Sequence, residues 1–399
     1  MGDCPLEKKM RKREVWKRVC CWCLIVMAAV TGTVRVHGAA SENGESKVAY
    51  VCAMVNGEAD GAVDVMARTR AADIPTVSFG EMSHEELEEL LLYPGGMPFG
   101  IKFYTEGVTV VGTCDVETAS GKVNPAADAG LRAKDMILRV NGEVLGSASQ
   151  LTEAIENSGG NALKMSCKRG AQEFEVTLKP AYCTAESRYK TGLWVRDSGA
   201  GIGTVTFIMP ETGAFAGLGH GICDADTGAL VAMRRGSVSD VTISSVVKGA
   251  AGAPGELKGY FNAGKVGALL GNSTCGVWGV FSEVPECPTE PMQIGLRDDI
   301  EEGDAYLMCT LDTNKIESYD IKISNVNRDA KGSKCFTVTV TDPDLIAASG
   351  GIVQGMSGSP IIQNGKLVGA VTHVLINDPT MGYGIFLENM LVNMPVPAR

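Results

Sequence analysis

Histidine and aromatic residues are scarce in this sequence, and their scarcity narrows the chemistry that it can perform. The chain of 399 residues has only 4 histidines, and its aromatic content is 6%. It has 13 cysteines, but those beyond the N-terminal apolar run show no metal-ligand spacing. A zinc site would therefore have few ligands to draw on. We expect neither a metal nor another cofactor.

Positive charge is also in short supply, with 36 Lys and Arg against 47 Asp and Glu. The formal net charge of -11 makes nucleic acid a poor candidate for a partner. The basic residues are concentrated at the start, where Lys8 to Arg18 precedes the uncharged run Val19 to Val34. This order is typical of an export signal. We predict a signal or membrane-anchor segment over residues 1–40, with its cleavage left open, and a linker with a small N-terminal region over 41–90.

Nucleotide-binding motifs are missing from the chain. The stretch "GAGIGT" at 199–204 lacks the G-x-G-x-x-G spacing and runs into a strand-like segment, and there is no P-loop. Residues 184–399 contain no sustained helical period, while glycine is abundant at 49 residues. Short strands and tight turns are therefore expected, which predicts a mainly β fold.

Residues 91–183 resemble a PDZ domain in the order of their predicted elements. Strands in "PFGIKFY" and "GVTVVGTC" precede a helix rich in alanine, and a second helix is expected near Ser149 to Asn157. PDZ domains bind an extended peptide as an added strand. We expect the backbone of Phe99, Gly100 and Ile101 to hold a peptide carboxylate, and the strand Ile101 to Tyr104 to flank the groove. The ligand would be a peptide C-terminus or an internal strand, which includes the chain's own; a packed domain without ligand is the alternative.

The stretch "GMSGSP" is the strongest candidate for a nucleophilic site. A serine hydroxyl needs a base to remove its proton and N–H donors for the developing oxyanion. Gly355 and Gly358 permit a tight turn around Ser357. We therefore predict Ser357 as the nucleophile and the N–H groups of Gly355 and Ser357 as the oxyanion hole.

The residues after this turn indicate which class of hydrolase is present. Asn364-Gly365 predicts a hairpin, and a G-x-S-G-x-P turn followed by a hairpin is typical of chymotrypsin-like proteases. The site lacks G-x-S-x-G, which weighs against an α/β-hydrolase. The predicted fold is thus a PDZ domain followed by a chymotrypsin-like double β-barrel protease domain over 184–399. The second strand of the hairpin would line the substrate cleft with Gly369, Ala370, Val371, Thr372 and His373.

The general base is most simply His220, which lies in the glycine-flanked turn "GLGHGICDADTG". His373 stands only sixteen positions after Ser357, so we interpret it as a specificity or packing residue. An orienting acid cannot be chosen from composition. Four aspartates lie at plausible strand ends, namely Asp224, Asp240, Asp342 and Asp378.

A longer set of segments resembles one peptidase family. The stretches "YPGGMPFGIKFYTEGVTVVG", "GLWVRDSGAGIGTVTF", "GLGHGICDADTG" and "TDPDLIAASGGIVQGMSGSP" are similar to the stage IV sporulation protein B family, PDZ-containing serine peptidases of endospore-forming bacteria in the chymotrypsin-like clan. The resemblance covers Leu91 to Leu391. It implies a triad of His220 as base, Asp342 as acid and Ser357 as nucleophile.

The resemblance also implies a role in signalling. Such a protein is exported, stays membrane-anchored or is released between the mother-cell and forespore membranes, and cleaves itself near its N-terminus. It then cuts a membrane-bound regulator, which triggers intramembrane proteolysis and activation of a late sigma factor. Two other functions stay open: a catalytically silent PDZ scaffold that binds peptides or partner proteins, and a housekeeping protease, although such enzymes usually carry the PDZ domain after the protease.

Overall fold

The computed structural model describes residues 76–78, 82–224, 228–311, 315–392 and 394–397. The predicted signal or anchor segment, 1–40, and most of the predicted linker region lie outside the described residues. None of the helices within the described ranges is long and apolar enough to cross a membrane. Ser83 caps the short helix α3 (His84–Glu88). Strand β1 (Thr76–Ser78) pairs with β25 (Pro395–Pro397).

Six strands close a first barrel, each pairing antiparallel with the next. Phe99, Ile101 and Phe103 alternate along one strand and point into its core, as the period of two along a strand requires. The ring runs in the order β12 (Leu193–Ile208), β13 (Ala214–Gly217), β17 (Gly276–Phe281), β16 (Gly267–Ser273), β14 (Met233–Val247) and β3 (Pro98–Thr113). Three further strands attach to it, β2 (Leu91–Pro94), β15 (Glu256–Phe261) and β18 (Met292–Gln293).

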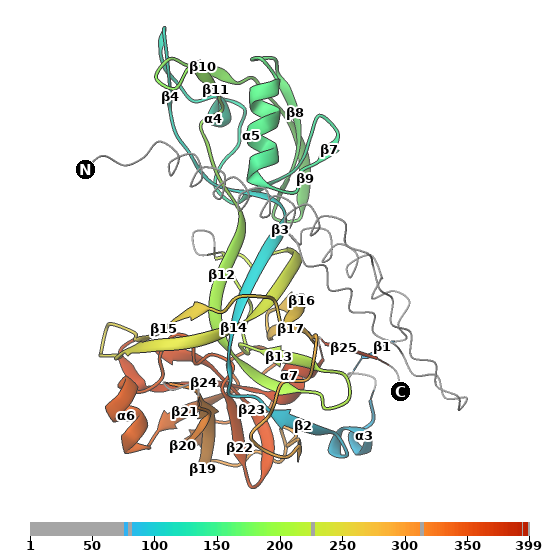
Figure 1. Cartoon of the computed structure of the whole chain (residues 1–399), viewed down its shortest axis with the longest axis vertical. Coiled ribbons are helices and arrows are strands. Elements are labelled where there is room, and N and C mark those ends of the chain that lie inside the picture. Colours follow the sequence, from blue (N-terminus) through green and yellow to red (C-terminus); the bar gives the residue numbers. More distant parts are fainter. Residues whose placement is uncertain (1–75, 79–81, 225–227, 312–314, 393, 398–399) are drawn as a thin grey trace, which may run out of the picture. The chain divides into compact units, whose positions relative to one another are not determined.

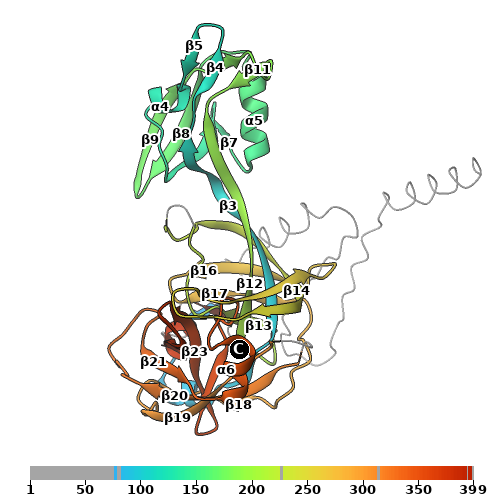
Figure 2. The same cartoon turned by 90° about the vertical axis from the view of Figure 1, so that its left-hand side faces the viewer.

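A second closed barrel follows in the chain (Figure 2). Its core is apolar, and Asn364 and Gly365 form its predicted hairpin turn with positive φ angles of 52° and 77°. Two helices accompany it, α6 (Pro343–Ser349) before the serine loop and α7 (Leu387–Leu391) after the last barrel strand. The strands run in the order β19 (Gly303–Cys309), β20 (Glu317–Ser324), β21 (Phe336–Val340), β24 (Asp378–Phe386), β23 (Lys366–Leu375) and β22 (Pro360–Gln363).

The PDZ-like part has a separate apolar core. Leu151 and Ile155, one turn apart on its longer helix, pack there against Val108, Ile137 and Met165. Its elements are β4 (Val116–Thr118), β5 (Gly121–Val123), α4 (Pro125–Asp128), β6 (Asp135–Val140), β7 (Glu143–Val144), α5 (Ala148–Asn157), β8 (Leu163–Arg169), β9 (Gln172–Leu178), β10 (Ala181–Cys183) and β11 (Arg188–Lys190). The fold is therefore mainly β, with a PDZ-like part and a double barrel, as predicted.

The boundary between these parts differs from the prediction at residue 91. Strands β3 and β12 are paired along almost their whole lengths and run side by side (Figure 1). The first half of β3 pairs with β14 in the barrel, whereas Val108 and Thr109 pair with β6. The PDZ-like part is thus inserted between two strands of the first barrel, and residues 91–106 belong to the peptidase.

This insertion overturns one predicted site. Phe99, Gly100 and Ile101 pair with β12 on one edge and with β14 on the other. Phe99 and Ile101 are also buried in the barrel core. Their backbone groups serve the sheet on both sides, so the prediction that they bind a peptide carboxylate is wrong.

Candidate active site

The loop that carries Ser357 joins α6 to β22 and contacts both barrels. The Thr204 N–H of β12 donates to the Ser357 carbonyl at 3.0 Å, and the Gly358 N–H donates to the Val371 carbonyl of β23 at 2.7 Å. Gly358 has a φ of 97°, and a Cβ there would collide with the backbone of Thr204 and Leu218. Only glycine adopts this positive φ without strain and also leaves room for the neighbouring backbone. The sequence "SGSP" is therefore required to bring Ser357 to the junction of the barrels.

Two N–H groups beside Ser357 are available to a ligand. The N–H of Met356 donates to the Val353 carbonyl at 3.1 Å, but in the described part of the chain those of Gly355 and Ser357 donate to no acceptor. The orientation of both is fixed through their peptide planes. The Gln354 carbonyl accepts from Leu257 N at 2.8 Å, and the Met356 carbonyl accepts from both the backbone and the hydroxyl of Ser359. This arrangement suits an oxyanion hole, because preorganised donors need no reorganisation during the reaction.

His220 lies directly after β13, in a turn where Leu218 and Gly219 have φ angles of 67° and 66°. Its Nδ1 lies 3.0 Å from the Gly221 carbonyl. A carbonyl can only accept, so Nδ1 carries the hydrogen and Nε2 keeps its lone pair. Burial lowers the pKa of His220 below its usual 6.5. The imidazole is therefore neutral at pH 7 and able to act as a base through Nε2.

Ser357, Gly355 and His220 line one pocket of about 320 Å³. Within it, the Ser357 hydroxyl donates to the Thr372 carbonyl at 2.8 Å and forms no hydrogen bond with His220. Catalytic hydrogen bonds are often unformed in the absence of substrate. A rotation of the Ser357 side chain is all that is needed to free its proton for the base. The structure thus brings the predicted nucleophile, base and oxyanion donors together.

Asp342 is not brought to this pocket. It is the N-cap of α6, where its Oδ1 accepts from the N–H groups of Asp344 and Leu345 at 2.9 and 3.1 Å. Its Oδ2 accepts from the N–H of Asp320 at 3.2 Å. No hydrogen bond joins Asp342 to His220, so the structure does not show the orienting contact that the family resemblance implies.

The other candidate acids are also engaged or remote. Asp224 pairs with Arg196 at 2.9 Å, Asp378 accepts from Thr380, and Asp240 is exposed on β14. Among the residues that the structure describes, no Asp or Glu lines the pocket that holds Ser357. Across the described ranges, moreover, no group of three His, Cys, Asp or Glu side chains could hold a metal ion.

The predicted cleft wall on β23 is only partly correct. Gly369, Ala370 and Val371 are buried, and each pairs with β24 while β22 covers the other edge of the strand. No strand edge is left there for a substrate, so these three do not form a cleft wall. Thr372 and His373 do reach the site, because the first supplies the carbonyl that holds Ser357 and the ring of the second lies 5.0 Å from that of His220.

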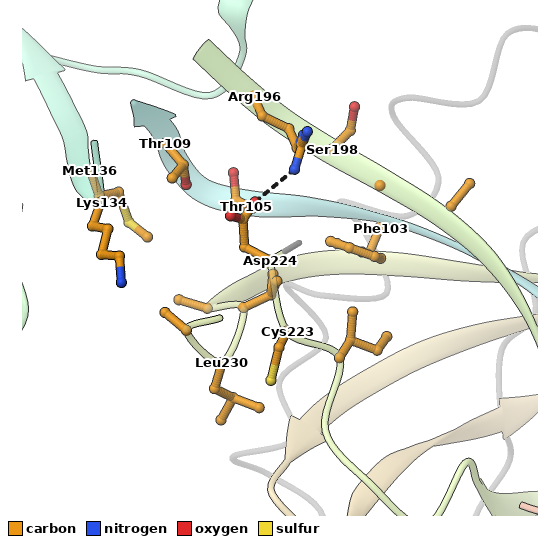
Figure 3. Close-up of a pocket in the computed structure, with 16 residues that line it drawn as sticks. Phe103, Thr105, Thr109, Lys134, Met136, Arg196, Ser198, Cys223, Asp224 and Leu230 are labelled. Carbon is orange, nitrogen blue, oxygen red and sulfur yellow. Dashed lines mark hydrogen bonds and ion pairs between the residues drawn. The ribbon is translucent and has the colours of Figure 1, made fainter. Parts of the chain in front are cut away.

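A second pocket, of about 400 Å³, was not foreseen from the sequence (Figure 3). Figure 3 shows Arg196 of β12 joined to Asp224 at its edge, with Lys134 on the opposite side. Both pockets share four lining residues, Phe103, Ala200, Ile222 and Cys223. The space next to Ser357 therefore continues past the small residues of β12 toward a charged end.

Comparisons with known proteins give a family for the peptidase part. A family model described as SpoIVB peptidase S55 matches residues 187–391. A comparison with curated proteins gives no significant match.

Solved structures show local likeness. The PDZ domain of the SdrC-like protein from Listeria monocytogenes is 23% identical, covering 23% of this chain and 87% of its own, with a TM-score of 0.19. The Rv3671c protease in its inactive form is 14% identical, covering 47% of this chain and 80% of its own, with a TM-score of 0.25. A serine-to-alanine variant of Rv3671c from M. tuberculosis is 15% identical, covering 49% and 84%, with a TM-score of 0.26.

Proposed function

Because this chain belongs to the SpoIVB peptidase S55 family and is therefore a serine endopeptidase, we propose that it is an exported signalling protease that cleaves itself and a membrane-bound regulator. The single observation that supports the site is the set of groups around Ser357. One pocket holds a serine, a neutral imidazole and two N–H donors that have no acceptor in the described chain.

The proposed mechanism is acyl transfer. Ser357 leaves the Thr372 carbonyl, passes its proton to Nε2 of His220 and attacks the carbonyl carbon of the scissile peptide. The N–H groups of Gly355 and Ser357 bind the oxyanion that forms. The His220 imidazolium then gives its proton to the leaving amine, and a water molecule releases the acyl group by the reverse sequence.

The substrate is a polypeptide that passes along β12. The shared lining of the two pockets supports this path, since glycines at 199 and 201 and Ala200 leave room for a peptide backbone. Residues of the substrate beyond the scissile bond would meet Arg196 and Asp224. We also propose that the PDZ-like part binds a peptide. Its helix α5 contacts β12 and β11, so the peptide groove would lie between α5 and these strands.

The cellular part of the proposal rests on the N-terminus and on the family. The basic head and apolar run of residues 1–40 are typical of export, which would place the peptidase between the mother-cell and forespore membranes. Cleavage near its own N-terminus would release it from an anchor. Its cut in a membrane-bound regulator would trigger intramembrane proteolysis and late sigma-factor activation during sporulation.

The test uses the full chain inserted into vesicles. We expect a fluorophosphonate probe to label the wild type and a shortened chain to accumulate, with its new N-terminus found by sequencing. Ser357→Ala should abolish both, whereas the matched control Ser149→Ala, an exposed serine on α5, should change neither. Persistent self-cleavage in Ser357→Ala would show that the nucleophile lies elsewhere, and a silent scaffold would give no labelling in any variant.

A further inference from the structure

Strand β12 runs from the PDZ-like part into the first barrel, and one of its two edges is mostly unpaired (Figure 1). Its inner edge pairs with β3 from Leu193 to Thr204. Its outer edge pairs with β13, but only from Val205 onward. Among the described residues, no strand pairs with the outer edge from Leu193 to Gly203. Such an edge presents N–H and C=O groups to which an extended peptide can add as a further strand.

The hydrogen bonds of Thr204 show which peptide groups face outward. Its N–H donates to the Ser357 carbonyl at 3.0 Å, and its carbonyl accepts from the Leu218 N–H at 3.2 Å. Successive residues of a paired strand direct their peptide groups to opposite edges, so those of Ala200 and Ile202 also face outward. Within the described ranges, the outward groups of these two residues have no hydrogen-bond partner.

One end of this outer edge lies at the active site. Ala200 and Ile202 line the pocket that holds Ser357 and His220. The serine loop itself occupies the outer edge at Thr204, and the outward groups of Ile202 lie about 7 Å further along the strand. A peptide strand bound to Ile202 would therefore begin where the serine loop ends, with its first residues beside the nucleophile.

The other end of the same edge lies in the PDZ-like part. Leu193 and Val195 pack against the core of that part, and α5 contacts β12. The start of α5 is fixed to the strand, because the Ala148 N–H donates to Asp197 Oδ2 at 2.7 Å. Since β3 occupies the inner edge of β12, a peptide between α5 and β12 can pair only with the outer edge.

We propose that one segment of the substrate occupies the outer edge of β12 from the active site to the PDZ-like part, so that both bind the same polypeptide. The segment runs antiparallel to β12, as β13 does on this edge. Residues after the scissile bond then lie toward Leu193. Because seven positions separate Val195 from Ile202, the PDZ-like part holds residues about seven to nine positions after the scissile bond.

This inference rests on the proposed function and adds the class of substrate. The substrate is an extended, unfolded segment with about nine or more residues after the scissile bond. Short peptides that end close to that bond would reach Ser357 but would leave most of the outer edge of β12 empty.

Peptides of graded length test whether one segment spans both parts. Each copies this chain's own sequence around the self-cleavage site found by N-terminal sequencing, continues for about three to about twelve residues after the scissile bond, and ends in an amide. With the full chain we expect kcat/KM to rise roughly 10- to 100-fold up to about nine residues and then to level off, which corresponds to one or two strand hydrogen bonds. Methylation of single peptide nitrogens should lower kcat/KM at every second position over this length, because only alternate N–H groups face β12.

Ala200→Pro tests the strand edge itself. Proline removes the outward N–H without breaking a hydrogen bond to β3, and its ring blocks an added strand. The gain in kcat/KM with peptide length should disappear, and the ratio of kcat/KM for the longest peptide to the rate of fluorophosphonate labelling should fall at least about 10-fold. Thermal unfolding monitors the fold of the variant.

The matched control is Glu173→Pro on β9, which is another edge strand and is far from Ser357 in the sheet order. Arg169 and Gln172 flank the two-residue turn before it and form a hydrogen-bonded pair, so the N–H of the next residue, Glu173, also faces outward. This variant should keep the length dependence of the wild type.

The outcomes separate this inference from the proposed function. If the wild type is labelled at Ser357 but cuts the shortest peptides as fast as the longest, the substrate does not reach the PDZ-like part and the inference is wrong. A gain that comes only from residues before the scissile bond, or one that survives Ala200→Pro, would also overturn it. If the wild type is neither labelled nor cleaves itself, the proposed function fails and the inference fails with it.

Discussion

Asp342 offers the sharpest test, because a cap and a triad acid respond to substitution in opposite ways. In the structure its carboxylate accepts three backbone N–H groups, two in the first turn of α6 and one from Asp320. Replacing an N-cap Asp by Ala costs about 1 kcal/mol, and the lost bond to Asp320 adds about 1 kcal/mol more. We therefore expect Asp342→Ala to lower the free energy of unfolding by about 2 kcal/mol.

Asp342→Asn should cost less, because Asn is as good an N-cap as Asp. It keeps the oxygen that Asp344 and Leu345 use and loses only the bond to Asp320, which is roughly 1 kcal/mol. Its labelling by a fluorophosphonate at neutral pH should stay within about 3-fold of the wild type. If Asp342 instead orients His220, Asn should reduce the rate by about 10⁴-fold with little change in thermal unfolding. That result would refute the reasoning from the structure.

Two further predictions concern the serine loop. Gly358→Ala should lower the free energy of unfolding by at least about 2 kcal/mol and labelling by more than 10-fold, because its Cβ collides with backbone. Gly365→Ala is the matched control, with a positive φ but open space, and should cost only about 1 kcal/mol and leave labelling intact. Ser359→Ala removes the hydroxyl that helps to orient the Met356 carbonyl, and it should reduce labelling by about 10-fold. The control is Thr206→Val, which removes the hydroxyl that donates to the Gly358 carbonyl, a peptide group outside the proposed oxyanion hole. If both variants lose labelling equally, the Ser359 hydroxyl does not act through the oxyanion hole.

Local chemistry explains what could be predicted from the sequence. The turn around Ser357 and the hairpin through Asn364-Gly365 depend on glycine and asparagine at set positions, so the residues themselves indicate the backbone. The alternation of Phe99 and Ile101 likewise indicates a strand with one buried face. The alternation does not indicate which core the buried face belongs to. The predicted start of the PDZ-like part at residue 91 is wrong for this reason, because Phe99 and Ile101 lie in the first barrel.

Long-range placement explains the rest of the site. The sequence does contain a signal that Asp342 is a cap, since Asp followed by Pro343 is typical of a helix start, and the seven-residue helix α6 begins there. No local signal places His373 against His220, because the two lie on different barrels and meet only through tertiary packing. The second pocket with Arg196 and Asp224 also joins residues that are distant in the chain.

The insertion of the PDZ-like part has a consequence for the order of folding. Thr113 and Leu193 form the first pair of the β3–β12 ladder, with roughly 80 residues between them, and closing an unfolded loop of that length costs about 4 kcal/mol of chain entropy. If the inserted part folds first, its own core brings these two residues together, and the remaining pairs toward Pro98 can then form in sequence. The insert would act as a nucleus for the first barrel. Mutations that weaken its core should then slow the appearance of peptidase activity during refolding, although the insert contains none of the proposed catalytic residues.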